Sequence, residues 1–151
     1  MADADARAWL EALVWPEHTE RLARLRAAMQ VVASDPPTLF AGDLVDRLDA
    51  ALAAVPAGAT PVVFHSAVLN YVGRDHRGRF AEVIADHPEI VWISNEGPGV
   101  LDGVATDLGV PGGAKSAAHF LVVLGGVEVV AISDPHGSWI RWASSTPTIC
   151  Q

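Results

Sequence analysis

The chain has 151 residues, half of them hydrophobic, and its 18 acidic and 10 basic residues give a formal net charge of −8. This length suits one domain with one core, and the composition is that of a globular protein. The acidic balance would repel a phosphate backbone, so we expect no nucleic-acid partner. No apolar run approaches the ~20 residues of a membrane span, and no signal segment opens the chain. We therefore expect a cytoplasmic protein with no membrane partner.

The first part of the chain carries two helical patterns. Over residues 5–33, apolar side chains recur at spacings of three and four, which predicts two helices separated by Pro16. Proline suits the first turn of a helix, so the second helix is expected to start near Trp15 and Pro16. Asp35-Pro36-Pro37 then prevents continuation. Residues 1–37 are thus predicted to be a helical lead-in to a single α/β domain over 1–151.

The middle of the chain alternates short apolar runs with helical patterns. The predicted order is strand 38–40, helix 44–55, strand 61–64, helix 75–85 and strand 90–94. Alternation of this kind is typical of right-handed βαβ units. The fold class predicted from it is α/β, with a mostly parallel, Rossmann-like sheet over 38–94.

The last third of the chain is predicted to close the sheet with antiparallel strands. Residues 95–118 are rich in glycine and lack a period, so we expect a long loop. Two apolar runs, 119–124 and 127–133, are joined by Gly125-Gly126, which is a hairpin signal. A final strand is expected within 138–142.

Polar side chains at strand ends are the candidates for chemistry. His65 and Ser66 directly follow a buried strand, and in open α/β sheets ligands bind beyond the carboxyl ends of the strands. His65 is therefore the candidate catalytic residue, and Ser66 is a candidate ligand-binding residue or a simple helix cap. Asn95 and Glu96 follow the next strand and either line the same cleft or are ordinary loop residues.

Other chemistries find less support in the sequence. The histidines lack metal-ligand spacing, and the lone Cys150 has no second thiol to share a metal, so we expect no metal site. A serine hydrolase would need the G-x-S-x-G turn, and the residues around Ser66 lack both glycines.

Three segments carry a family resemblance: residues 14–22, 62–68 and 137–142. Together they resemble DUF2332, an actinobacterial family of unknown function, over nearly the whole chain. Family members are typically about twice this length, so the chain resembles the C-terminal half of the family pattern.

The DUF2332 pattern is in turn similar to the sheet of class I S-adenosylmethionine-dependent methyltransferases. That resemblance implies that residues 38–40, 61–64 and 90–94 are the third, fourth and fifth strands. Asp43 would then lie near the adenine amino group of S-adenosylmethionine, although Gly42-Asp43 before a helix is also a common turn and N-cap. His65 would lie on the reaction side.

The sequence also departs from the methyltransferase pattern. The first strand, its Gly-rich turn and the ribose-binding acid of the second strand are missing, and no G-x-G-x-x-G occurs. The missing strands would leave an apolar edge on Val62-Val63-Phe64, which invites pairing with another chain. Either a front half is removed here, or the short form dimerises, or the chain is a relic.

Two functions follow as hypotheses. The first is a partial S-adenosylmethionine-dependent methyltransferase-like domain of unknown substrate, weak or inactive alone. Asp43, Ser66, Asn95 and Glu96 would bind the cofactor, and a small-molecule ligand would be a partner of the domain. The alternative is a non-enzymatic interaction domain that forms a homodimer through the exposed sheet edge.

Overall fold

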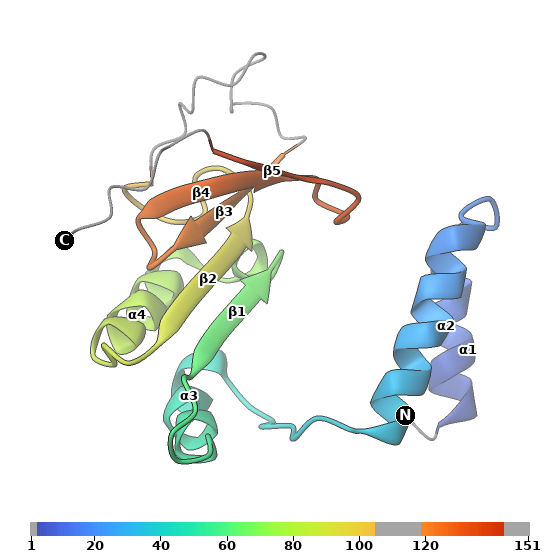
Figure 1. Cartoon of the computed structure of the whole chain (residues 1–151), viewed down its shortest axis with the longest axis horizontal. Coiled ribbons are helices and arrows are strands. Elements are labelled where there is room, and N and C mark those ends of the chain that lie inside the picture. Colours follow the sequence, from blue (N-terminus) through green and yellow to red (C-terminus); the bar gives the residue numbers. More distant parts are fainter. Residues whose placement is uncertain (1–2, 105–118, 144–151) are drawn as a thin grey trace. The chain divides into compact units, whose positions relative to one another are not determined.

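The structure, a computed structural model, describes residues 3–104 and 119–143. The chain divides into two compact units, residues 1–41 and 42–151. The described helices and strands (Figure 1) are α1 (Ala4–Ala12), α2 (Thr19–Ser34), α3 (Leu44–Ala53), β1 (Val62–Ser66), the 3-10 helix η1 (Leu69–Tyr71), α4 (Arg74–Ala85), β2 (Val91–Glu96), β3 (Phe120–Leu124), β4 (Glu128–Ser133) and β5 (Ile140–Trp142).

The first unit is a helical hairpin, as the sequence predicts. Asp3 caps α1 by accepting from two backbone N–H groups, and an ion pair of 2.7 Å joins Arg26 of α2 to Glu11 of α1. The start of α2 differs from the prediction, because the helix begins at Thr19 rather than near Pro16. His18 N donates to Trp15 O at 2.9 Å, so Pro16 occupies the second position of a separate turn, where proline is also favoured.

The second unit is built on a five-stranded sheet in the order β1-β2-β3-β4-β5. The chain is mixed α/β, but the expectation of a mostly parallel sheet is wrong. Only β1 and β2 run parallel, joined through α4, and the other three neighbouring pairs are antiparallel. The strand expected over residues 38–40 does not form, which leaves a single parallel pair among the described strands. The short turn over residues 125–127 can join β3 and β4 only as antiparallel neighbours.

The predicted strand over residues 38–40 is absent, since these residues are irregular and Leu39 is 85% exposed. Pro36 and Pro37, which precede it, have no N–H for a strand ladder. The predicted loop also begins later than expected, because β2 continues through Asn95 and Glu96. Its residues 105–118 lie outside the described ranges.

The sheet presents two different faces. Its helix face carries Trp92, which packs with Phe80 and Ile84 of α4 and with Val45 and Leu48 of α3 in the main core cluster. Alternation along the strands places Val62, Phe64, Val91 and Leu124 on the opposite face, and all four side chains are exposed. We call this second surface the open face.

Candidate functional site

The candidate residues gather where β1 and β2 end. The parallel register pairs His65 with Ser94 and Ser66 with Asn95, so the carboxyl ends of the two strands lie side by side. His65 points to the helix face and Ser66 to the open face, because successive side chains alternate. This end of the sheet therefore carries two polar groups, one on each face.

On the helix face, three side chains form a buried hydrogen-bonded chain. Trp92 Nε1 donates to His65 Nε2 at 3.0 Å, and His65 Nδ1 lies 2.9 Å from Glu96 Oε1. An indole nitrogen can only donate, so His65 Nε2 accepts and the ring proton sits on Nδ1, where it is donated to Glu96. Both ring nitrogens are thus occupied, with His65 8% and Glu96 2% exposed.

Glu96 also fixes the chain after β1. Its Oε1 accepts from the backbone N–H groups of Val68 and Leu69 at 2.9 and 3.0 Å, which satisfies the start of η1. Ala67, in the left-handed conformation with a φ of 55°, turns the chain into this position. Glu96, rather than Ser66, therefore performs the capping role that the sequence left open for Ser66.

On the open face, a second polar chain crosses the sheet. Asn95 Nδ2 donates to Ser66 Oγ at 3.1 Å, and Ser133 Oγ of β4 donates to Asn95 Oδ1 at 2.7 Å. Ser66 and Asn95 are half-buried. Side-chain amide and hydroxyl groups at such a place can donate to or accept from a polar ligand.

Asp43 has a separate position at the start of α3. Its carboxylate accepts from the N–H groups of Val45 and Asp46 and contacts His76 Nε2 at 2.9 Å. The Val45 N–H group is the main cause that lowers the pKa of Asp43. Within the described ranges, no hydrogen bond connects Asp43 to His65, Ser66, Asn95 or Glu96. Hydrogen bonds thus join His65 to Glu96 and Ser66 to Asn95, as two separate pairs on opposite faces of the sheet.

Trp92 and Ser133 are the residues of these two polar chains that were not among the sequence candidates. The sequence does contain a signal for Trp92. Along β2, Trp92, Ser94 and Glu96 occupy every second position, so their side chains are expected on the same face. To predict that the buried His65 ring would lie beside Trp92, one also needs the register between β1 and β2. The sequence alone does not give that register.

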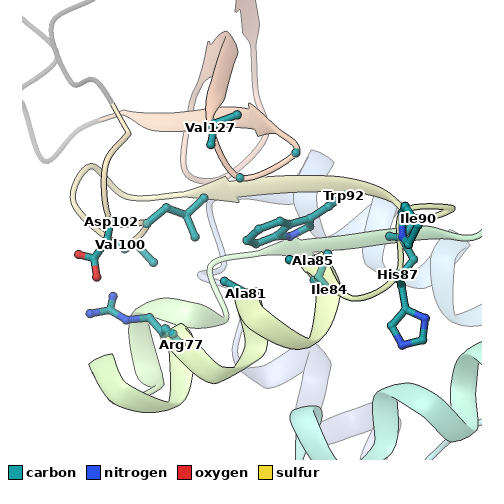
Figure 2. Close-up of a pocket in the computed structure, with 15 residues that line it drawn as sticks. Arg77, Ala81, Ile84, Ala85, His87, Ile90, Trp92, Val100, Asp102 and Val127 are labelled. Carbon is teal, nitrogen blue, oxygen red and sulfur yellow. The ribbon is translucent and has the colours of Figure 1, made fainter.

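A pocket of about 380 Å³ lies on the other side of Trp92, between α4, residues 100–102 and the β3–β4 turn (Figure 2). Over the described residues, no cluster of three or more His, Cys, Asp or Glu side chains could hold a metal ion. No helix in the same residues is long and apolar enough to cross a bilayer.

One family model matches the chain, over residues 1–142, and its description is "Uncharacterized protein conserved in bacteria (DUF2332)". The match covers well over half of the sequence, so the chain belongs to this family of uncharacterised bacterial proteins. Neither the curated proteins nor the solved structures contain a significant match to it.

Proposed function

We propose that the chain is an interaction module that dimerises by pairing the free edge of β1 with β1 of a second copy. The observation that supports this proposal is the place of β1 at the end of the sheet order, with β2 on one side of it. An edge strand presents unpaired N–H and C=O groups that form a template for another strand.

The backbone pattern identifies which groups face outward. Pro61 O accepts from Val91 N, and Ala67 N donates to Asn95 O, so the odd-numbered residues of this segment bond to β2. Bonded positions alternate along a parallel ladder. The N–H and C=O groups of Val62, Phe64 and Ser66 therefore point to the free edge.

The side chains of β1 favour pairing of its free edge with another strand, because none of them blocks such pairing. Native edges are usually guarded by lysine, by proline or by a bulge, and the sequence VVFHS contains neither residue. Val62 is 56% and Phe64 62% exposed. An antiparallel pair centred on a two-fold axis at Phe64 would place the two Phe64 rings together and use all three outward amides of each copy.

The test is the mass of the chain in solution, measured by sedimentation equilibrium over a range of concentrations. We expect twice the chain mass for the wild type and a monomer for Phe64→Pro, because proline removes an outward N–H and leaves the bonds to β2 in place. Phe64→Thr keeps that N–H and should weaken the dimer only partly.

The control variant is Val127→Thr, which removes an exposed apolar side chain from the hairpin turn, away from the edge. It should keep the wild-type mass. A wild-type chain that stays monomeric, or a Phe64→Pro chain that stays dimeric, contradicts the proposal.

A second candidate function is binding of S-adenosylmethionine, as in a partial methyltransferase-like domain of unknown substrate. What supports it is the polar group at the carboxyl ends of two parallel strands, where Asn95 binds Ser66 at 3.1 Å. S-adenosylmethionine would supply a transferable methyl group. Ser66 and Asn95 would contact the cofactor from the open face, and Asp43 would accept from the adenine amine. Glu96 and His65, which are buried on the helix face, would act by holding the ends of β1 and β2 in place.

Calorimetric titration of the chain with S-adenosylmethionine and S-adenosylhomocysteine tests this second candidate. If this candidate holds, we expect saturable, weak binding. Asn95→Ala or Asp43→Ala should each reduce the affinity about tenfold, since each removes a hydrogen bond to the ligand. A folded chain that binds neither compound contradicts it, whatever the mass measurement shows.

A further inference from the structure

The pocket beside Trp92 has an apolar body. Its walls include Ala81 and Ile84 of α4, Ile90, Trp92 and Val100, and the Gly125-Gly126 turn closes it from the hairpin side. A volume of about 380 Å³ is within the range of pockets that bind small molecules. The pocket lies wholly within the second unit of the chain.

One end of this pocket carries an excess of positive charge. Figure 2 shows Arg77 and Asp102 there, with their side chains directed toward each other. The Asp102 carboxylate is bound by Arg74 through both oxygens, at 3.0 and 3.3 Å. The guanidinium groups of Arg74 and Arg77 thus lie beside the single carboxylate of Asp102. The three groups together carry one net positive charge.

Arg77, which lines this pocket, has a side-chain nitrogen that the fold leaves unpaired. Its Nε is buried and has no hydrogen-bond partner among the described residues. A buried donor without a partner costs free energy, and a small shift of the Arg77 side chain that let a ligand oxygen accept from Nε would offset that cost. Arginine is well suited to carboxylate and phosphate groups, which it can bind with two parallel hydrogen bonds.

The floor of the pocket is rigid. The Trp92 ring is held by the hydrogen bond to His65 and by an edge contact with Phe80, whose ring centroid is 6.0 Å away. The buried chain through Glu96 and His65 therefore fixes the indole plane over which an apolar group could lie. A pre-formed apolar wall reduces the entropic cost of binding.

We propose that this pocket binds a small amphipathic carboxylate, with its head on Arg77 and its apolar body over Trp92. This site is separate from the β1 edge and from the Ser66–Asn95 group. It stands whether or not the chain dimerises.

Three probes separate the contributions of head and body. Octanoate has both a carboxylate and an apolar chain, octan-1-ol has the chain without the charge, and acetate has the charge without the chain. Calorimetry should give the tightest binding for octanoate, by about tenfold over either of the others. In nitrogen-correlated NMR spectra, octanoate should shift the Arg77 Nε–H and Trp92 Nε1–H signals.

The decisive variant is Arg77→Gln, with Arg79→Gln as its matched control on the exposed side of the same helix. Arg77→Gln should weaken octanoate binding about tenfold or more and leave octan-1-ol unchanged, whereas Arg79→Gln should change neither by more than about twofold. Ala85→Leu, which fills part of the pocket, should weaken both ligands.

Circular dichroism confirms that each variant is folded. Equal affinities for octanoate and octan-1-ol, or equal effects of the two arginine variants, would overturn the carboxylate assignment. The absence of saturable octanoate binding to the wild type up to about 10 mM would overturn the site itself.

Discussion

Glu96 is the residue on which the buried polar contacts of the sheet converge, since one of its oxygens accepts from His65, Val68 and Leu69. Removing it leaves three donors without a partner in the core. We expect Glu96→Ala to lower the free energy of unfolding by about 3 kcal/mol. Glu96→Gln keeps an oxygen in the same place and should cost less than about 1 kcal/mol.

Urea denaturation of both variants measures the difference. A loss of the near-ultraviolet signal of Trp92 in Glu96→Ala but not in Glu96→Gln would further show that the indole depends on this chain of contacts. Equal stabilities of the two variants would contradict the central position that we assign to the Glu96 oxygen.

His87 offers a prediction on pH. The pKa of His87 is raised, mainly by the hydrogen bond between its ring and Glu89. A further hydrogen bond to Asp49 also raises it. The fold thus favours protonated His87. Its stabilising contribution is present below the unfolded pKa of about 6.5 and is lost as the pH rises through the higher folded pKa.

An NMR titration of the His87 ring tests the cause of this shift. The pKa should fall toward its ordinary value in Glu89→Gln and stay raised in Glu82→Gln, which removes an exposed acid from α4. The same pKa in both variants would show that Glu89 is not the source.

At the scale of elements, the β3–β4 turn depends on two glycines with different surroundings. Gly125 and Gly126 have φ values of 60° and 75°, and a side chain at Gly126 would collide with the Trp92 ring, whereas Gly125 faces open space. We expect Gly125→Ala to cost about 1 kcal/mol, from the left-handed backbone alone. Gly126→Ala adds the collision with a fixed ring and should cost at least about 2 kcal/mol.

Paired urea denaturation curves for the two variants measure these costs. The comparison isolates the collision, because both positions share the same turn and the same backbone strain. A Gly126→Ala chain as stable as Gly125→Ala would mean that Trp92 is free to move aside.

The elements also show what the sequence could predict. Periodicity and capping indicated α3, α4 and the hairpin within a few residues, since these depend on local chemistry. The strand expected at 38–40 failed because a three-residue segment forms a strand only when a neighbour pairs with it. A mostly parallel sheet was expected because three strands were placed in βαβ units. Without the first of them, β1 and β2 form a single parallel pair among the described strands, while the expected antiparallel hairpin is confirmed.

The candidate site was predictable in position but not in its contacts. His65 and Ser66 were found because they follow an apolar strand. That Glu96 would bind His65 depends on the register that pairs His65 with Ser94, which no pattern within either strand specifies. Asp43 was placed by family resemblance, and its observed N-cap role was the other interpretation that the sequence left open.

At the scale of the whole molecule, the second unit combines a covered sheet face with an open face that exposes Val62 and Phe64. Such a surface is typical of interaction sites when it is contiguous with an unguarded strand edge. The dimer proposed here would extend the sheet across two copies, and the pocket beside Trp92, on the helix face, would stay accessible.

Amide hydrogen exchange along β1 tests this account most directly. The amides of Val63, His65 and Ala67 bond toward β2 and should be protected at any concentration. The amides of Val62, Phe64 and Ser66 should be protected in concentrated protein and should exchange rapidly in dilute protein. In Phe64→Thr their protection should require a higher protein concentration than in the wild type. Rapid exchange of these three amides at every concentration would contradict pairing through the β1 edge.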